Sequence, residues 1–240
     1  MNNIIPKKIH ISWVDKNLLN NDCFLLEIGI KNLISNNPNW SLQISDDNDV
    51  EQYLKKNICS EFYSLLKDQH IVAKLDVWRL VKIYNEGGLY IDIDRICDVK
   101  LDNVIEKHVK WVLPTNGNYD FSQDILLSSP SNPIFFETLE AMFQRRKLGY
   151  KDIYFLGAQT YMHAITKCLF DEVIHTDPGD EVFEAIRKNL DQIPFIQHFK
   201  EQLPNYTFLN RQQKITHEEW SIYKKHLYKK FNLKHWTNNW

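Results

Sequence analysis

The sequence has few cysteines, and they are widely separated. Cys23, Cys59, Cys97 and Cys168 form no Cys-x-x-Cys pair. This spacing indicates neither a disulfide framework nor a zinc site, and it favours a reducing compartment.

Long apolar runs and an excess of charge are also absent. No uninterrupted apolar run reaches the roughly 18 residues of a membrane span, and Met1–Lys8 has no apolar core for export. We therefore expect no integral membrane segment. For a chain that is complete as given, we expect a cytoplasmic location, in a host cytoplasm if the protein is viral or an effector. The net charge of -2 gives no electrostatic reason to bind nucleic acid or an anionic membrane, which favours small, roughly neutral partners.

The chain is long enough to fold as one domain with a sizeable core, since 43% of its 240 residues are hydrophobic. Apolar residues alternate over Lys8–Val14 and again at 40–44, as in strands, whereas 17–35 and 50–56 have helical spacing. This order predicts an α/β sheet with a ligand at the carboxyl ends of its strands. The acidic run Asp46–Asp49 is expected to cap the second helix and to face solvent.

The most informative stretch is Leu89–Arg95, which follows a predicted helix over 71–85 and a tight glycine turn. Because side chains alternate along a strand, Asp92 and Asp94 are predicted to point to the same side, where the buried strand reaches the surface. Paired carboxylates there suit Mg²⁺ or Mn²⁺, which take oxygen ligands and usually bridge to substrate phosphates. The alternative is a solvated strand end.

This stretch and the helix before it resemble the Asp-x-x-Arg…Gly-Gly-x-Tyr-x-Asp-x-Asp signature of glycosyltransferase family 32, whose sugar-binding region contains a DXD motif. The family includes yeast-type α-mannosyltransferases, bacterial capsule transferases and clostridial glucosylating toxins. The matching residues are Asp76, Arg79, Gly87, Gly88, Tyr90, Asp92 and Asp94. The resemblance implies an α/β fold of the GT-A nucleotide-diphospho-sugar transferase type, with a mixed central sheet flanked by helices and a helical C-terminal half.

The resemblance also implies roles for individual residues. Asp94 would ligate Mn²⁺ (or Mg²⁺) directly, and Asp92 would contact sugar or ribose hydroxyls and metal-bound water. Asp76 and Arg79 would face the sugar and its diphosphate. They lie three residues apart on one helix face, so the alternative is an intrahelical ion pair contributing about 0.2 to 0.5 kcal/mol. Asp124, just before a predicted strand at 125–128, matches a family position beside the sugar.

Both ends of the chain resemble the family as well. Lys8–Val14 is similar to its opening Ile-Pro-Lys-x-Ile-His-x-x-Trp, and in the toxin branch that tryptophan stacks on uracil. Trp13 is therefore a candidate base platform in a UDP-sugar site, GDP being the second choice; the alternative is a core aromatic. The segment 235–240 resembles the terminal His-His-Trp-x-x-Ser-Trp. It implies metal contacts for His235 and Asn239 and a phosphate contact for Trp240, with 234–240 closing as a lid.

This terminal motif has departures: Lys234 stands in place of the first histidine and Asn239 in place of serine. Asparagine still offers a carbonyl oxygen to a hard cation. Further upstream, Phe155–Thr160 resembles the family's Thr-Gly-Pro segment. Three other segments have local signals: 175–180 is turn-like, 181–200 has helical periodicity broken at a proline, and a capping box at Thr216–Glu219 opens a polar helix whose lysines are expected to be solvated.

Together these features predict one domain over 1–240, with a nucleotide-sugar-binding half (1–130) and a helical acceptor-side half (131–240). We expect a metal-dependent glycosyltransferase that moves a hexose from a nucleoside diphosphate sugar to a glycan, a protein or another hydroxyl acceptor. Retention of configuration is implied by the resemblance alone. Two alternatives stay open, a non-catalytic nucleotide-sugar-binding protein and a Mg²⁺-dependent phosphohydrolase.

Overall fold

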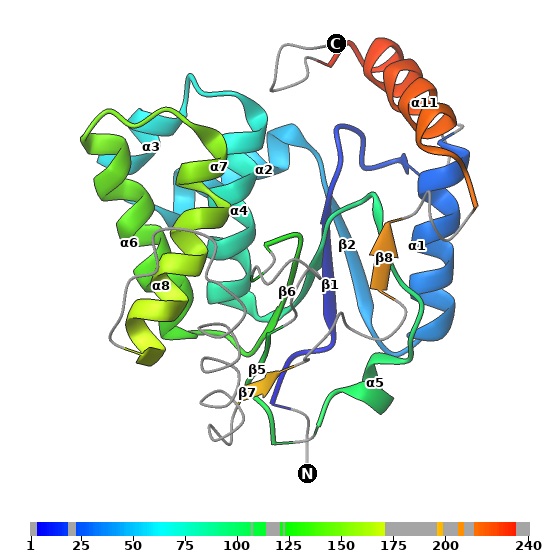
Figure 1. Cartoon of the computed structure of the whole chain (residues 1–240), viewed down its shortest axis with the longest axis horizontal. Helices are drawn as coiled ribbons and strands as arrows, with labels where there is room; N and C mark the ends of the chain where they lie inside the picture. The colour runs from blue at the N-terminus through cyan, green and yellow to red at the C-terminus, as the bar shows by residue number, and fades with distance from the viewer. Residues whose placement is uncertain are drawn as a thin grey trace.

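The computed structural model describes residues 4–18, 23–106, 108–113, 121, 123–170, 196–198, 206–208 and 214–233. Within them, strands and helices alternate along the first half of the chain, as predicted (Figure 1). The strands are β1 (Lys8–Ser12), β2 (Ser41–Ser45), β3 (Gly88–Ile91), β4 (Arg95–Cys97), β5 (Trp111–Leu113), β6 (Ile125–Ser128), β7 (Ile196–His198) and β8 (Tyr206–Phe208). The helices are α1 (Phe24–Asn36), α2 (Asp47–Asn57), α3 (Ser60–Leu66), α4 (Ile71–Glu86), α5 (Leu101–Val104), α6 (Pro133–Lys147), α7 (Ile153–Leu156), α8 (Ala158–Phe170) and α11 (His217–Lys230).

The central sheet is mixed. Among the described strands it has six members in the order β2-β1-β3-β6-β5-β7, and β4 pairs with β8 in a separate ribbon. β1 runs parallel to β2 and β3, whereas β6 is antiparallel to β3. The carboxyl ends of β1, β2 and β3 therefore meet the amino end of β6 at one edge of the sheet. Trp13, Asp46, Asp92 and Asp124 adjoin those four strand ends.

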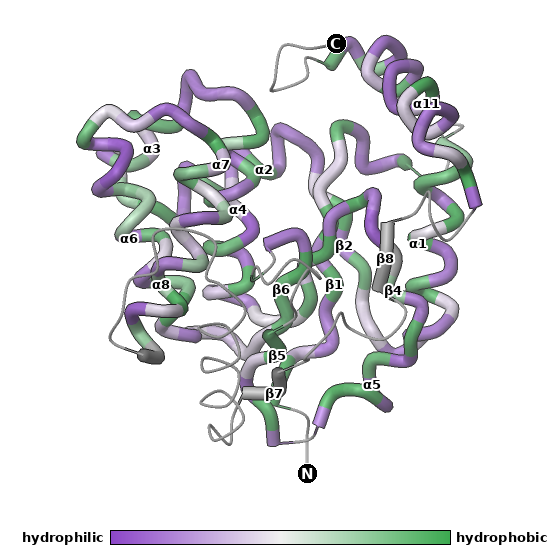
Figure 2. The backbone as a smooth tube through the Cα atoms, viewed as in Figure 1, coloured by the Kyte–Doolittle hydropathy of each residue, from purple (hydrophilic) through white to green (hydrophobic). Residues whose placement is uncertain are grey.

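Two apolar cores cover the two faces of the sheet, with α1 and α11 on one side and α4, α6 and α8 on the other (Figure 1). Because side chains alternate along a strand, β3 supplies both cores: Leu89 and Ile91 pack on the α1 side and Tyr90 on the α4 side. Figure 2 shows hydrophobic residues along β6 and hydrophilic ones on much of α11. None of the described helices combines the length and apolar character needed to cross a bilayer.

The local signals at helix starts are confirmed. Asp46 and Asp49 form a reciprocal capping box on α2, and Thr216 and Glu219 do the same on α11. Asn132 caps α6, with a proline in its first turn, by accepting a hydrogen bond from the Ile134 amide at 3.1 Å.

Three expectations about elements need correction. β3 ends at Ile91, so Asp92 and Asp94 lie in a turn, in which the Arg95 amide donates to the Asp92 carbonyl at 3.0 Å. Helix α1 begins at Phe24 rather than at residue 17. Part of the expected helical segment 181–200 is strand β7, which pairs with β5. The turn expected at 175–180 lies outside the described residues.

The turn between α4 and β3 requires both of its glycines. Gly87 and Gly88 have φ values of +64° and +97°, in the left-handed region that side chains rarely adopt. A Cβ on Gly88 would lie 2.5 Å from the Lys8 carbonyl oxygen of β1. The close contact between β1 and this turn is therefore possible because residue 88 has no side chain.

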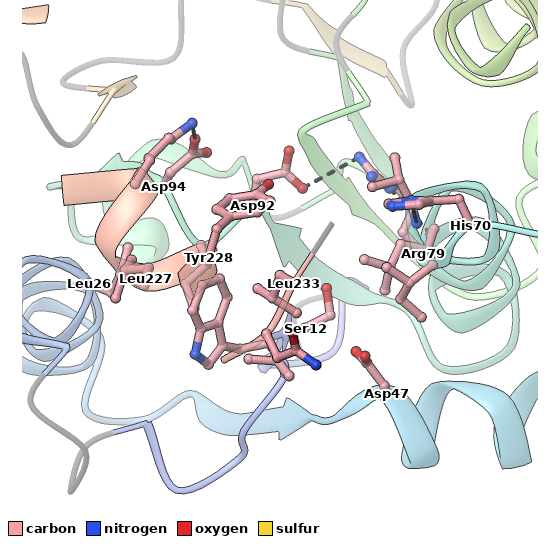
Figure 3. Close-up of a pocket in the computed structure, with 18 of the residues that line it drawn as sticks. Ser12, Leu26, Asp47, His70, Arg79, Asp92, Asp94, Leu227, Tyr228 and Leu233 are labelled. Carbon is pink, nitrogen blue, oxygen red and sulfur yellow. Dashed lines mark hydrogen bonds and ion pairs between the residues drawn. The ribbon is translucent and has the colours of Figure 1, made fainter. Parts of the chain in front are cut away.

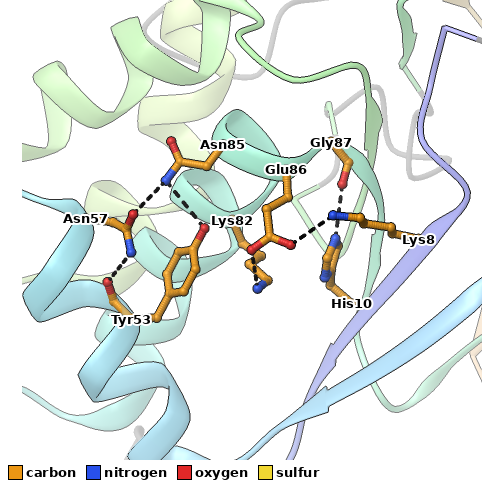
Figure 4. A network of polar contacts seen from close by, with 8 residues as sticks. All are labelled: Lys8, His10, Tyr53, Asn57, Lys82, Asn85, Glu86 and Gly87. Atoms are coloured by element: carbon orange, nitrogen blue, oxygen red, sulfur yellow. Dashed lines mark hydrogen bonds and ion pairs between the residues drawn. The ribbon is translucent and has the colours of Figure 1, made fainter.

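His10 of β1 holds the same turn through its ring. Its Nε2 lies 3.0 Å from the carbonyl oxygen of Gly87 (Figure 4). Because a carbonyl only accepts, Nε2 carries the proton. The ring is fully buried, and this burial lowers the pKa of His10 to about 4, although the bond to Gly87 and the nearby Glu86 oppose the shift. His10 is therefore neutral in the folded protein at physiological pH.

The buried His10 predicts an acid-dependent loss of stability. Its pKa is depressed on folding, so its contribution is complete above about pH 6.5 and is lost as the pH falls towards 4. The full shift corresponds to roughly 3 kcal/mol of unfolding free energy. His10→Gln keeps an amide donor for Gly87 but does not titrate. Urea unfolding between pH 7 and pH 4 should therefore show a smaller loss for the variant, and equal losses in both proteins would contradict this.

Candidate functional site

A cavity of about 380 Å³ lies where β1, β2 and β3 end. Figure 3 shows side chains from separate elements around it. Its lining consists of Ser12, Trp13 and Val14 around the end of β1, Leu26 of α1, Asp47 of α2, His70 just before α4, Ile71, Val72, Leu75 and Arg79 of α4, Tyr90, Asp92, Ile93 and Asp94 around the end of β3, and Trp220, Lys224, Leu227, Tyr228, Asn232 and Leu233 on and after α11. The predicted ligand position at the carboxyl ends of the strands thus coincides with a real cavity.

Arg79 connects the central helix to this cavity. Its Nη2 lies 2.9 Å from Asp76 Oδ1, so the intrahelical ion pair does form, but both residues are buried. Its Nη1 donates to the Gln123 carbonyl at 3.0 Å and lies 3.4 Å from Asp92 Oδ1. Burial opposes the charge, but Tyr90, Asp92 and Asp76 outweigh burial and raise the pKa of Arg79. The guanidinium therefore stays charged and fixed beside Asp92.

The Asp92 carboxylate is held by Tyr90 and Arg79. The Tyr90 hydroxyl donates to its Oδ1, and its backbone amide donates to the Asp124 carbonyl at 2.8 Å. Burial raises the pKa of Asp92 to about 6; Arg79 opposes the shift, while the charges of Asp124 and Asp94 add to it. Two further carboxylates thus act on Asp92 electrostatically.

Asp94 reaches the cavity from the turn after β3 and pairs with a lysine of α11. Lys224 Nζ lies 2.9 Å from Asp94 Oδ2, so the expectation that the α11 lysines are solvated is wrong for Lys224. Lys225, Lys229 and Lys230 are exposed, as expected. The docking of α11 on the first core turns one lysine inward.

The carboxylates of the cavity match, in type and number, those that usually bind a hard divalent cation. Mg²⁺ takes one or two protein carboxylates and completes its coordination with substrate phosphates and water. Asp92 and Asp94 supply two carboxylates in one cavity. In the part of the chain that the structure describes, no cluster of three or more His, Cys, Asp or Glu side chains could hold a metal by itself. A cation here would therefore need ligands from a bound phosphate, water or other parts of the chain.

Asp124 lies beside this site without lining the cavity. Its carboxylate forms a largely buried ion pair with Arg95, and its carbonyl accepts a hydrogen bond from the Asp92 amide. Through these contacts Asp124 joins the start of β6 to the turn that carries the two carboxylates.

Trp13 lines the cavity and also packs against the first core. Its ring meets Phe231 edge to face, with centroids 5.7 Å apart and planes at 83°, and its amide donates to the Ser45 carbonyl at 3.0 Å. The residue is half-buried, so the geometry suits both a base platform and a core contact.

Three candidate residues, His235, Asn239 and Trp240, lie outside the described residues, as does the predicted lid over 234–240. The last described residues, Asn232 and Leu233, still line the cavity. The chain thus reaches the cavity immediately before this segment.

Most of the lining residues, among them Asp47 and His70, had no predicted role in the site. Asp47 was expected on a solvated acidic run, but its carboxyl faces the cavity, and burial raises its pKa. His70 caps α4, where its Nδ1 accepts from the Val72 amide at 3.2 Å. Both stand at helix starts near the functional edge of the sheet, which is the signal that could have identified them.

The segment that resembles Thr-Gly-Pro closes directly on Asp76. A Cβ on Gly157 would lie 2.7 Å from Asp76 Oδ2, so a glycine is needed for close contact rather than for backbone conformation. Arg145 holds the segment, donating to the Phe155 carbonyl at 3.0 Å and to Thr160 Oγ1 at 2.6 Å. Helix α8 begins at residue 158, directly after this glycine.

This contact predicts a coupled stability effect. Gly157→Ala should destabilise the protein by about 1 to 3 kcal/mol, the usual cost of overpacking. The cost should be smaller in an Asp76→Ala background, which removes the two nearest atoms. Chemical denaturation of the four proteins of the cycle measures this coupling. Gly149→Ala is the control: it meets no atom within 4 Å and is strained only by its φ of +87°, so it should show no coupling to Asp76.

Comparison with known proteins identifies the region that carries this geometry. Residues 26–111 match the family model described as "Glycosyltransferase sugar-binding region containing DXD motif". The match includes Asp76, Arg79, Asp92 and Asp94, the residues on which the resemblance was based.

Two curated relatives are glycosyltransferases by name. The chain is 22% identical over 141 residues to inositol phosphoceramide mannosyltransferase 1 of Schizosaccharomyces pombe, covering 56% of this chain and 42% of the relative. It is 22% identical over 175 residues to uncharacterized glycosyltransferase L373 of Acanthamoeba polyphaga mimivirus, covering 68% and 66%. The chain thus spans less than two thirds of the length of either relative.

A solved structure shares the fold. The PaToxG glycosyltransferase matches with a TM-score of 0.52 at 18% identity, covering 77% of this chain and 74% of that chain. This confirms the predicted mixed α/β fold of the GT-A type. Residues 26–111 therefore match a glycosyltransferase sugar-binding region containing a DXD motif, and the chain is similar to glycosyltransferases in this region and in its fold.

Proposed function

We propose that the protein transfers a hexose from a nucleoside diphosphate sugar, UDP rather than GDP, to a hydroxyl group of a glycan or protein, with Mn²⁺ or Mg²⁺ as cofactor. The observation that carries the proposal is the position of Asp92 and Asp94 in one cavity at the carboxyl ends of three parallel strands, beside the buried cation of Arg79. Such an edge is where α/β sheets bind nucleotides.

The nucleoside is assigned to the Trp13 side of the cavity. An aromatic ring offers a stacking surface to any base, worth roughly 1 to 3 kcal/mol, and Trp13 is held in place by Phe231. The choice of uracil rests on the resemblance to the toxin branch. Asp92 is assigned to hydroxyls of the ribose or the sugar, because its carboxylate lines the cavity and is fixed by Tyr90 and Arg79.

The diphosphate is assigned to the Asp94 side. Asp92 and Asp94 would hold the divalent cation, and the family resemblance adds His235 and Asn239. When bound, such a cation supplies Lewis-acid stabilisation of the leaving diphosphate. The resemblance also assigns Trp240 to the departing phosphate.

Arg79 and Asp76 are assigned to the sugar and its diphosphate. The guanidinium is fixed by Asp76 on one side and by the Gln123 carbonyl on the other, so its charge is preorganised for a developing negative charge. Asp124 fixes the carboxylate turn and lies near the sugar in this proposal. Retention of the anomeric configuration rests on the family resemblance alone.

The direct test is to incubate the protein with Mn²⁺ and a panel of UDP-hexoses together with GDP-mannose, without an acceptor. GDP-mannose is included because one relative is a mannosyltransferase by name. Slow release of free sugar with intact UDP or GDP supports the transferase. Binding without turnover indicates a non-catalytic nucleotide-sugar-binding protein, and free phosphate indicates a phosphohydrolase. EDTA should abolish sugar release.

Asp94→Asn tests the metal assignment. It should lower turnover by about 10² to 10³, the scale for losing one electrostatic stabiliser of developing charge. Its effect on folding should be small, at most about 1 kcal/mol, because it weakens a partly exposed ion pair. Asp98→Asn, an exposed carboxylate outside the cavity, is the control and should leave turnover unchanged. Near wild-type turnover of Asp94→Asn with Mn²⁺ would refute the assignment.

Trp13→Leu separates the two possible roles of Trp13. A base platform predicts that UDP affinity, measured by calorimetry, falls by about 1 to 3 kcal/mol. Trp40→Leu is the matched control, because Trp40 is a buried core residue that does not line the cavity. It should lose stability in a denaturant melt while UDP binding to the folded protein is retained. If Trp13→Leu behaves in the same way, Trp13 is a core residue only.

A further inference from the structure

The described part of the cavity presents two Arg or Lys side chains, and they differ in how fully they are engaged. Arg79 is buried and already contacts Asp76, Asp92 and the Gln123 carbonyl. Lys224 is about one-third exposed, and among the described residues its ammonium group makes one ion pair, with Asp94. Since an ammonium group has three N–H donors, Lys224 can bind a further anion without a change of fold.

The face of α11 that carries Lys224 lines the cavity. Trp220, Lys224, Leu227 and Tyr228 recur at helical spacing and all line the cavity. Trp220 and Leu227 are buried in the first core and anchor α11 to it. The Lys224 ammonium lies 5.4 Å from the centre of the Trp220 ring, so the two side chains make a cation–π contact. Because α11 is anchored and the Lys224 side chain is partly exposed, its ammonium group is accessible from the cavity.

The charges that line the cavity favour such a cation. A diphosphate brings negative charge to a cavity already lined by Asp47, Asp92 and Asp94. A divalent cation offsets part of this charge. In this structure Lys224 neutralises Asp94, the same carboxylate that the proposed function assigns to the metal. Lys224 and the metal are therefore alternative positive partners of Asp94.

We propose that Lys224 is a positioning residue for the diphosphate of the sugar donor. It pairs with Asp94 when the cavity holds no metal, and it turns to a phosphate oxygen when metal and diphosphate bind together. This inference rests on the proposed function, because it uses the same donor and the same metal. It makes α11 part of the donor site, so that the acceptor-side half of the chain also contributes to donor binding.

The proposal predicts effects of opposite sign on two ligands for Lys224→Met, which keeps much of the stem against Trp220 but removes the charge. Mn²⁺ alone should bind about 2- to 10-fold more tightly, because Asp94 is released and a like charge is removed. UDP in saturating Mn²⁺ should bind about 10- to 100-fold more weakly, the range for one hydrogen bond to a charged group. Inorganic pyrophosphate with Mn²⁺ should show the same loss as UDP, since the contact is to phosphate.

Two controls isolate the charge at this position. Lys225→Met alters the neighbouring exposed lysine, which does not line the cavity, and should leave both affinities unchanged. Lys224→Arg keeps the charge and should retain UDP affinity within about 3-fold, since either cation can bind a phosphate. Calorimetry gives the UDP and pyrophosphate affinities, electron paramagnetic resonance counts free Mn²⁺, and thermal melts check that each variant is folded.

The outcomes separate this inference from the proposed function. If the wild type binds UDP or pyrophosphate with Mn²⁺ and folded Lys224→Met binds them equally well, the ion pair serves only to attach α11 and this inference is overturned. If UDP binding falls but Mn²⁺ binding also weakens, competition for Asp94 is refuted. If the wild type binds none of UDP, GDP and pyrophosphate, the proposed function and this inference both fail.

Discussion

Strand β3 ends at a fixed point, and the geometry of the cavity depends on it. All four of its residues are buried, and it pairs with β1 on one side and β6 on the other. Gly88 permits the close contact with β1 at its start, while the Asp92 amide bonds to the start of β6 at its end. A shift by one residue would exchange the side chains on the two faces and move both carboxylates. Pairing on both edges therefore positions Asp92 and Asp94.

Concentrated negative charge at this edge is balanced by cations from different elements. Asp92 faces Arg79 of α4, Asp124 faces Arg95 of β4, and Asp94 faces Lys224 of α11. Fixed charges of this kind cost little reorganisation when a charged substrate binds, which is how preorganised sites stabilise developing charge. The two arginines are at most 13% exposed and hold the geometry, while Lys224 is one-third exposed and is the cation that we propose to exchange partners.

The two halves expected from the sequence are not separate at the cavity. It is lined by residues of β1, β3 and α4 from the first half and by residues of α11 from the C-terminal half. Outside the lining, the α7–α8 junction contacts Asp76 through Gly157, where no side chain could be accommodated without a shift. A bound donor at this cavity would therefore contact both halves of the chain.

The sequence by itself determined the features that depend on neighbouring residues: the glycine turn, the capping boxes of α2 and α11, the strand that precedes the carboxylates and the Asp76–Arg79 pair. These follow from local backbone preference and from helical or strand periodicity. Tertiary structure decided which of those residues meet. Lys224 and Asp94 are 130 residues apart in the chain, and the inward orientation of Asp47 and the contact of Gly157 with Asp76 are equally non-local. Periodicity shows which face of an element is apolar, but strand order and helix docking decide what that face contacts, and neither is encoded in any single stretch of the sequence.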